Sequence, residues 1–353
     1  MKTKLIFIVA LLLNYHAHLQ GKVKPTFYLT NNEARMPVVV RGNLCSNVLI
    51  VFLHGGPGGT ALKKIGTRAF NSLEKEFGLV YWDQRGADAS RGGAQRKWMN
   101  LKQFVSDLDM LINYLHFLYP NSSLYLMGHC WGGALATAYL GDYVRQTKIA
   151  GWINVAGAYN NPKSDSLSAI RVKNYAKQMI RKKENETYWQ YALQWYKKNP
   201  TFTSAQLTHY TFVKESFGYQ RIEGDSLGQF PCYTMRDLLL RPAQYIGYYL
   251  NYYRALNNFI ISDIDLTTEM KNIKIPSLII WGELDGLIPV EMAHHAYRAL
   301  ATIPESKELH ILPNTAHTVF YEQPVVFSET VKRFITHHQK AKNQILVKDS
   351  VSI

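Results

Sequence analysis

Cysteine is scarce in this chain, which has three cysteines, Cys45, Cys130 and Cys232, among 353 residues. Three cysteines are too few for a disulfide framework, which excludes the class of small domains held together by disulfides. A bridge between Cys45 and Cys232 stays open, because sequence alone cannot establish the Cα separation that a disulfide requires. Internal repeats and low-complexity segments are also absent from the sequence, which excludes repeat architectures.

Long hydrophobic runs are lacking too. The run nearest the start, Leu5–Leu13, carries no charge, follows two lysines and precedes polar residues. This order is typical of a secretory signal peptide, which we place at residues 1–21, with cleavage after either Ala17 or Gly21. The run is too short to span a bilayer, and an uncleaved signal anchor is the alternative. We therefore expect an exported protein, periplasmic or secreted, with no stable membrane insertion after signal removal.

Acidic residues are the third shortage. The chain has 26 Asp and Glu residues and 40 Lys and Arg residues, which gives a formal net charge of +14. Basic residues are densest between Lys163 and Lys183, where they could attract anionic substrates or surfaces. The preferred interpretation is a solvated helix. No nucleic-acid-binding motif accompanies the charge, so nucleic acid is not an expected partner.

Segments with the pattern of buried strands alternate along the chain with segments that have the pattern of helices. This alternation predicts an α/β fold with a mostly parallel sheet covered by helices on both faces, in one core with an insertion. Strands are expected at residues 37–41, 48–53, 77–83, 123–128, 149–156, 277–282 and 307–312. Helices are expected near residues 66–76, 101–118, 131–144, 290–300 and 325–338.

The sequence GHCWGG at residues 128–133 lies between a strand pattern and a helix pattern. It predicts a sharp strand-to-helix turn of the nucleophile-elbow type, with Cys130 where such turns usually carry serine. Gly128 and Gly132 lack the Cβ atoms that would clash where the strand and the helix pass close together. A buried cysteine is more often an inert small hydrophobe, so this motif alone is a hypothesis of nucleophilic catalysis.

Two other motifs begin at the ends of expected strands. HGGPGG at residues 54–59 can present backbone N–H groups, and we expect the N–H of Gly56 to donate to a developing oxyanion together with that of Trp131. WDQRG at residues 82–86 follows another strand. Its Asp83 and Arg85 are expected to form a structural ion pair that braces the loops.

In this order and spacing, HGGPGG, WDQRG and GHCWGG resemble the motifs of the α/β-hydrolase fold, most of all those of its proline iminopeptidase branch, the S33 peptidase-like hydrolases. The resemblance extends over nearly all of the chain after the signal sequence. It implies a triad in the order nucleophile, acid, histidine. Asp285 stands at the acid position of the family, with Glu283 in reserve, and His317 stands at its histidine position.

The resemblance also implies an inserted helical cap, which we place at residues 159–266, where helical runs are dense in aromatic residues. The α/β-hydrolase core then comprises residues 22–158 and 267–339, and residues 340–353 form a C-terminal tail. The aromatic residues of the cap are expected mainly to pack against one another. His54 and His129 are expected to line the site, and the histidines other than His317 are expected to be structural or solvated.

These residues predict acyl-bond hydrolysis through a covalent acyl-Cys130 intermediate, without a cofactor or a metal. His317 takes the thiol proton, Asp285 orients the imidazolium, and the N–H groups of Gly56 and Trp131 hold the oxyanion. A neighbouring histidine and a helix N-terminus both favour the reactive thiolate. Because a thiolate is easily expelled again, small-molecule esters, thioesters and lactones are favoured over peptides as substrates.

Three alternatives stay open. An aminopeptidase that acts on short peptides is the first, although the family uses serine and recognises a free amino group with acidic cap residues. The acids of the expected cap match no such pattern; they are Glu184, Glu186, Glu215, Glu223, Asp225 and Asp237. An acyltransferase is the second, because the Gly-x-Cys-x-Gly-Gly box also resembles that of polyhydroxyalkanoate synthases. A non-catalytic binding protein on a hydrolase scaffold is the third, and the intact Asp285 and His317 count against it. The sequence does not indicate an oligomeric state.

Overall fold

The computed structural model of the chain describes residues 26–87, 89–202, 207–217 and 263–351, with side chains described as far as residue 339. The predicted signal peptide at residues 1–21 lies outside the described residues. So do Cys232 and the part of the expected cap that contains Glu223, Asp225 and Asp237.

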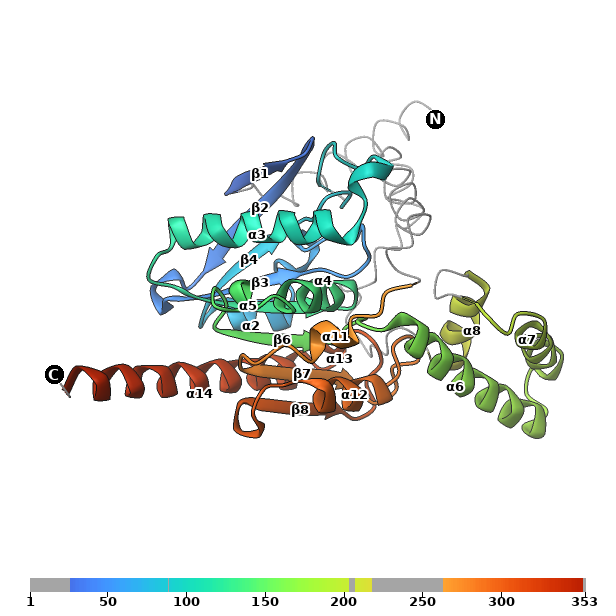
Figure 1. Cartoon of the computed structure of the whole chain (residues 1–353). Coiled ribbons are helices and arrows are strands. Elements are labelled where there is room, and N and C mark those ends of the chain that lie inside the picture. Colours follow the sequence, from blue (N-terminus) through green and yellow to red (C-terminus); the bar gives the residue numbers. More distant parts are fainter. Residues whose placement is uncertain (1–25, 88, 203–206, 218–262, 352–353) are drawn as a thin grey trace, which may run out of the picture.

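In the described part of the chain, one sheet of eight strands runs through the centre, in the order β1-β2-β4-β3-β5-β6-β7-β8 (Figure 1). The β1–β2 and β2–β4 pairs are antiparallel, and every pair from β4 to β8 is parallel. The strands are β1 (Phe27–Asn31), β2 (Ala34–Gly42), β3 (Val48–Leu53), β4 (Gly78–Trp82), β5 (Ser123–His129), β6 (Gly151–Val155), β7 (Ser277–Gly282) and β8 (Lys307–Leu312).

Helices cover both faces of this sheet. Helices α3, α4, α11 and α12 pack on one face, and helices α2, α13 and α14 pack on the other. The helices of the core are α2 (Arg68–Glu74), α3 (Leu101–Leu118), α4 (Trp131–Leu140), α5 (Tyr143–Gln146), α11 (Thr267–Met270), α12 (Glu291–Ala299), α13 (Val319–Glu322) and α14 (Pro324–Val351). The predicted mostly parallel sheet, covered on both faces, is therefore confirmed.

The strand interiors explain why the sheet takes this form. Every residue of β3, β4 and β7 is buried, which is the pattern of parallel strands covered on both sides. The first strand was not predicted, because only one of its five residues is buried and its pattern is weak. Helix α14 continues to Val351, well beyond the predicted end near residue 338 and through most of the segment assigned to a tail.

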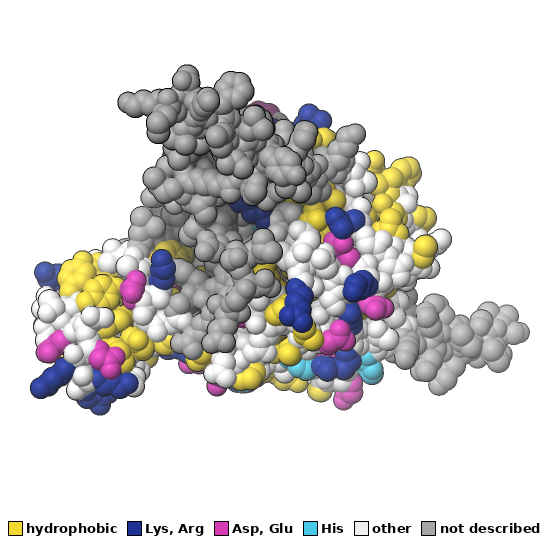
Figure 2. Space-filling model, turned by 180° about the vertical axis from the view of Figure 1, so that it is seen from behind, with side chains coloured by type: hydrophobic (Ala, Val, Ile, Leu, Met, Phe, Trp, Pro, Cys, Tyr) yellow, Lys and Arg dark blue, Asp and Glu magenta, His cyan; other side chains and the backbone are white. Residues whose placement is uncertain are grey.

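Three helices between β6 and β7 stand apart from the sheet and form the described part of the cap (Figure 1). They are α6 (Asn161–Lys182), α7 (Glu186–Lys198) and α8 (Leu207–Phe217). Trp189, Tyr196 and Phe212 belong to a small hydrophobic core of their own, so the described cap aromatics pack together as expected. On the face shown in Figure 2, basic side chains lie among acidic ones on the described surface and form no continuous band there.

Candidate active site

Four parallel strands bring the predicted site residues to one edge of the sheet. The HGGPGG loop follows β3, the elbow follows β5, the loop with Asp285 follows β7 and the loop with His317 follows β8. The carboxyl ends of parallel strands meet at the same edge, which is where open α/β sheets carry their sites. Segments far apart in the sequence therefore converge above this edge.

The turn between β5 and α4 has the geometry of a nucleophile elbow. Cys130 adopts a φ of 54° and a ψ of −119°, a conformation that side chains other than glycine rarely take. A Cβ atom on Gly128 would lie 2.4 Å from the carbonyl oxygen of Gly132, and one on Gly132 would lie 2.0 Å from that of Leu53. The two glycines are thus required by the close passage of backbone, as expected, and Cys130 is held at the apex of the turn.

Asp285 and His317 form a buried pair. The Nδ1–H of His317 donates to Oδ2 of Asp285 at 2.8 Å, and both residues are 0% exposed. The other oxygen of Asp285, Oδ1, accepts from the backbone N–H groups of Leu287 and Ile288, each at 2.9 Å. The carboxylate is therefore held by its own loop on one side and orients the histidine on the other.

The pKa of His317 is set by the side chains around it. Burial disfavours its imidazolium, but the negative charges of Asp285 and Cys130 and its hydrogen bonds to both side chains outweigh burial and raise the pKa of His317 well above the ordinary value. The structure thus brings Cys130, His317 and Asp285 together in the order that the motifs indicate. The raised pKa of His317 favours its imidazolium at neutral pH, beside the side chain of Cys130.

The HGGPGG loop faces the elbow. A Cβ atom on Gly55 would lie 3.2 Å from the Cβ of Cys130, so this glycine lets the loop backbone come close to the sulfur-bearing side chain. Gly56, the next residue, has a φ of 131°, which favours glycine. Trp131 is the first residue of α4, where a backbone N–H has no partner within the helix. The predicted oxyanion donors therefore belong to two segments that flank Cys130.

Gln84 joins these two segments, a role that was not predicted. Its Nε2 donates to the backbone carbonyl of His54 at 3.2 Å, and its Oε1 accepts from Nε1 of Trp131 at 2.9 Å. Its backbone N–H also donates to Nε2 of His54 at 3.1 Å. One fully buried amide thus fixes the start of the glycine-rich loop to the elbow. The signal in the sequence was its place in WDQRG at a strand end, but nothing there showed its partners.

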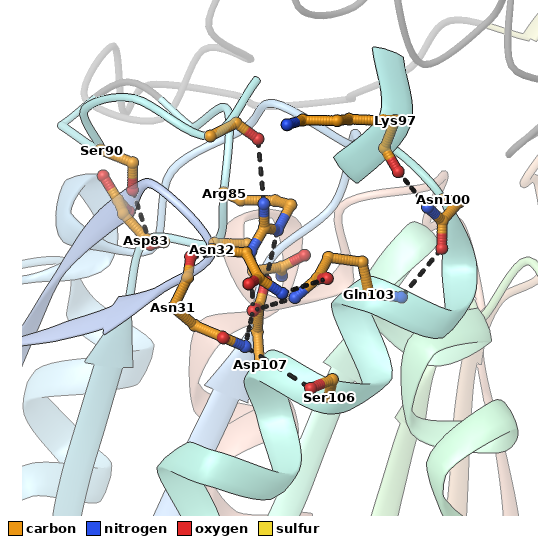
Figure 3. A network of polar contacts seen from close by, with 12 residues as sticks. Asn31, Asn32, Asp83, Arg85, Ser90, Lys97, Asn100, Gln103, Ser106 and Asp107 are labelled. Atoms are coloured by element: carbon orange, nitrogen blue, oxygen red, sulfur yellow. Dashed lines mark hydrogen bonds and ion pairs between the residues drawn. The ribbon is translucent and has the colours of Figure 1, made fainter. Parts of the chain in front are cut away.

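The expected ion pair of the WDQRG motif is wrong in its partner. Arg85 pairs with Asp107 of α3, with Nε 2.5 Å from Oδ2 and Nη2 2.8 Å from Oδ1 (Figure 3). Asp83 instead accepts from Oγ1 of Thr60 at 2.9 Å and from the N–H of Ala61 at 2.7 Å. The carboxylate of Asp83 thus holds the segment after HGGPGG, whereas Arg85 binds the carboxylate of Asp107. Arg85 still braces the loops, because it also donates to the carbonyl oxygen at residue 93 at 2.9 Å.

Two further histidines line the site, and both are neutral at neutral pH. Burial lowers the pKa of His54 to about 4, and its Nδ1–H donates to the carbonyl of Gly55 at 2.8 Å. Burial also lowers the pKa of His129 well below the ordinary value, with the charges of His317 and Lys64 acting in the same direction. The ring of His129 lies 4.8 Å from that of His317 between centroids. These imidazoles shape the site, and His317 is the titratable partner of Cys130.

The reserve acid and the remaining histidines lie elsewhere. Glu283 is exposed, and its carboxylate accepts from the backbone N–H of Asn314 at 3.2 Å rather than from His317. His310 pairs with Glu308 at 2.9 Å, and His295 contacts the hydroxyl of Tyr159. His294, His337 and His338 lie on α12 and α14. The structure therefore places Asp285, and not Glu283, beside the histidine.

Two negative findings concern only the described residues. They contain no group of three or more His, Cys, Asp or Glu side chains that could hold a metal ion. No helix among residues 26–87, 89–202, 207–217 and 263–351 has the length and apolar character needed to cross a membrane.

Comparison with known proteins gives a consistent assignment. The family described as alpha/beta hydrolase fold matches residues 48–324. The chain is 25% identical over 323 residues to "Probable aminopeptidase YbaC" of Bacillus subtilis (strain 168), covering 88% of this chain and 96% of the relative. It is 25% identical over 292 residues to a proline iminopeptidase of Heyndrickxia coagulans, covering 81% and 90%. The crystal structure of a proline iminopeptidase from Mycobacterium smegmatis has a TM-score of 0.62 at 15% identity, covering 89% of this chain and 99% of that chain. Because the family match extends over most of the chain, this protein belongs to the α/β-hydrolase fold family and has relatives among the proline iminopeptidases.

Proposed function

We propose that this chain hydrolyses the acyl bonds of small esters, thioesters or lactones through a covalent intermediate on Cys130. The observation that carries the proposal is the position of Cys130 at a strained apex beside the buried pair of His317 and Asp285. A non-glycine residue at positive φ costs about 1–3 kcal/mol and persists where the surrounding structure enforces it, often at functional sites. Packing alone gives no reason to hold a cysteine in this conformation.

The first half of the reaction forms the acyl-enzyme. The Cys130 thiolate attacks the carbonyl carbon, and the carbonyl π electrons move to the oxygen, which the N–H groups of Gly56 and Trp131 stabilise. The tetrahedral intermediate then collapses and breaks the bond to the leaving oxygen or sulfur. The imidazolium of His317 gives its Nε2 proton to that leaving group, so the alcohol or thiol departs neutral and His317 becomes neutral.

The second half returns the enzyme to its starting state. Neutral His317 takes a proton from water as the water oxygen attacks the acyl carbon, and the second tetrahedral intermediate expels the Cys130 thiolate. The products are a carboxylic acid and the thiolate–imidazolium pair. Asp285 holds Nδ1–H of His317 throughout, so that Nε2 always faces the reacting atoms.

The chemistry of sulfur favours this substrate class. When the first intermediate collapses, the thiolate competes with the substrate's own leaving group. An alkoxide or thiolate protonated by His317 leaves readily, whereas an amine is a poorer leaving group and return of the substrate is favoured. The barrier to forming the acyl-enzyme is therefore expected to be higher for an amide than for an ester.

An aminopeptidase is the second candidate, because the two relatives compared above are named as an aminopeptidase and a proline iminopeptidase. Such an enzyme needs a group that recognises the free amino end of its substrate. Of the described cap acids, Glu184, Glu186 and Glu215 are exposed, whereas Asp165 on α6 is buried. The leaving-group chemistry of the thiolate is therefore the reason to rank ester-type substrates first.

The N-terminal apolar run supports a further part of the proposal, that the mature protein works outside the cytoplasm. Amino-terminal sequencing of the protein recovered from the periplasm or the culture medium tests this. A start after Ala17 or Gly21 is expected. A start at Met1 would contradict signal removal.

A panel of p-nitrophenyl esters and prolyl-arylamides tests the function. The wild-type protein is expected to turn over the esters, with an acyl adduct on the Cys130 peptide detected by mass spectrometry. Cys130→Ala is expected to lose at least about 1,000-fold in kcat/KM. Cys130→Ser keeps a nucleophilic atom but replaces a thiol by the weaker hydroxyl nucleophile, and it is expected to lose at least about tenfold in kcat/KM, or about 1.4 kcal/mol of barrier. The exposed Cys45 provides the matched control, because Cys45→Ser is expected to leave turnover unchanged.

Each other outcome has a definite meaning. Turnover of prolyl-arylamides alone would move the aminopeptidase to first place. No turnover of either class, with Cys130 unmodified, would favour a binding protein. A gain of ester or prolyl-amide hydrolysis in Cys130→Ser would show that the site is that of a serine hydrolase and would end the argument from thiol chemistry.

A further inference from the structure

One face of the cap helix α6 forms hydrogen bonds to the loop that carries Asp285. Ser164, Ser168 and Arg171 are spaced so that all three lie on the same side of the helix. All three donate to backbone carbonyls of the acid loop, residues 283–287. The shortest of these bonds joins Oγ of Ser168 to the carbonyl oxygen of Gly286 at 2.6 Å, and both residues are buried.

The hydrogen bond of Ser168 continues to the carboxylate through one peptide group. The carbonyl of Gly286 and the N–H of Leu287 belong to the same planar trans peptide, so they point in opposite directions. Ser168 holds the carbonyl end, and the N–H end donates to Oδ1 of Asp285 at 2.9 Å. A donor on the carbonyl polarises the peptide and strengthens donation by its N–H. Ser168 therefore orients and reinforces a bond to the candidate catalytic acid.

The next peptide repeats the arrangement with a longer bond. Oγ of Ser164 lies 3.4 Å from the carbonyl oxygen of Leu287, and the N–H of Ile288, in the same peptide group, donates to Oδ1 of Asp285 at 2.9 Å. Arg171 adds two contacts, to the carbonyl of Asp285 at 3.3 Å and to that of Glu283 at 3.4 Å. The acid loop is thus held along its length by α6, and Ser168 makes the closest contact.

Ser168 is itself held by a buried histidine of the cap. The hydroxyl of Ser168 donates to the carbonyl oxygen of Gly286, so its oxygen accepts from Nε2–H of His209 at 3.2 Å. Nδ1 of His209 then accepts from the hydroxyl of Tyr196 at 2.7 Å. Burial lowers the pKa of His209 to about 4, so the ring is neutral and can accept and donate in this way. His209 and Tyr196 are both buried, on α8 and α7.

We infer that Ser168, with His209 and Tyr196 behind it, is a positioning residue for Asp285, and that the cap and the triad are joined by a continuous chain of hydrogen bonds. The inference rests on the role given to Asp285 in the proposed function. The chain runs from α7 through α8 and α6 to the Gly286 peptide, and from there through Asp285 to His317. With Oδ1 fixed from this side, Oδ2 faces His317 and sustains its imidazolium.

Alkylation of Cys130 by iodoacetamide tests the inference without any choice of substrate. The rate is followed on the Cys130 peptide by mass spectrometry between pH 6 and pH 10. Ser168→Ala is expected to slow alkylation at pH 6 by about threefold to tenfold, the range that loss of one hydrogen bond gives, because a less firmly held Asp285 stabilises the imidazolium beside the thiolate less well. At pH 10 the variant and wild-type rates are expected to converge, because the thiolate then no longer needs the imidazolium.

Ser216→Ala is the matched control, because Ser216 is also a buried serine of the cap but donates to the carbonyl of Phe212 in its own helix. It is expected to alkylate like the wild type. Tyr196→Phe removes a single oxygen at the far end of the chain and is expected to slow the reaction at pH 6 by about twofold. Thermal unfolding of each variant checks that it is folded. If Ser168→Ala does not fold, the alkylation rate of Tyr196→Phe provides the test.

The results separate this inference from the proposed function. Equal rates for Ser168→Ala and Ser216→Ala at pH 6, with Cys130 reactive in both, would overturn the positioning role and leave the triad intact. A slower rate that persists unchanged at pH 10 would indicate general damage to the site and would equally overturn the role. A wild-type Cys130 that reacts no faster than Cys45 would remove the triad and the inference together.

Discussion

Replacing Asp285 by asparagine is the sharpest test of the site, because the surrounding donors decide how the new amide must lie. Oδ1 of Asp285 accepts from the N–H groups of Leu287 and Ile288. An asparagine must turn its carbonyl oxygen to these two donors, since its NH2 group there would face donors only. The NH2 group then faces Nδ1 of His317, which has to accept. The proton of the imidazole moves to Nε2, and His317 can no longer take a proton on that side.

The expected magnitude follows from this wrong tautomer together with the lost charge. The negative charge of Asp285 is the leading cause that raises the pKa of His317. In a serine protease triad, the same Asp-to-Asn change costs about 10,000-fold in kcat, which sets the scale here. Cys130 is intrinsically more nucleophilic than serine, so we expect a smaller loss of about 1,000-fold, or about 4 kcal/mol of barrier.

Steady-state hydrolysis of a p-nitrophenyl ester by Asp285→Asn measures the loss in kcat. Glu283→Gln is the matched control, because Glu283 lies in the same loop but is exposed and contacts Asn314 instead. Its kcat is expected to stay within about twofold of wild type. Activity of Asp285→Asn within about tenfold of wild type, or an equal loss in Glu283→Gln, would refute the assignment of the acid.

Three further outcomes are expected. Iodoacetamide should modify Cys130 faster than the more exposed Cys45, as measured by peptide mass spectrometry, and the reverse order would show that accessibility alone decides. Asp107→Asn leaves the fully buried Arg85 without its counter-charge, so the free energy of unfolding, measured by urea denaturation, should fall by about 3–5 kcal/mol. A fall of less than about 1 kcal/mol would match an exposed ion pair and contradict the structure. The pKa of His317 is raised in the free enzyme, so its proton is retained above the ordinary range. The alkaline limb of the pH profile of kcat/KM, which reports groups of the free enzyme, should therefore lie well above pH 6.5, and a limb near 6.5 would exclude the imidazolium as the acid.

Much of the sheet and the residues at its edge could be predicted from the sequence. Buried parallel strands appear as continuous apolar runs, and Cys130, Asp285 and His317 each follow such a run. Strand β1 could not be predicted, because it lies at the edge of the sheet and buries a single residue. A strand can thus be predicted from the sequence where both of its faces are covered.

The contacts between side chains were harder to predict, because they depend on which elements meet. Arg85 finds Asp107 on a helix that the motif does not contain. Gln84 bridges two segments that converge only in the folded chain. Ser168 resembles any polar residue of a solvated helix, although it is fully buried against the acid loop. Sequence patterns indicate periodicity and burial, whereas these roles require knowledge of the neighbouring element.

The place of the cap in the chain has a consequence for biosynthesis. Strands β6 and β7 are neighbours in the sheet, yet the whole cap separates them in the chain. Chains are made from the N-terminus, and pairing between distant segments is slow because a large loop must close first. Cys130 is therefore synthesised well before Asp285 and His317. On the proposed function, the thiol of Cys130 therefore lacks its two partners until β7 and β8 join the sheet, because Asp285 and His317 follow those strands.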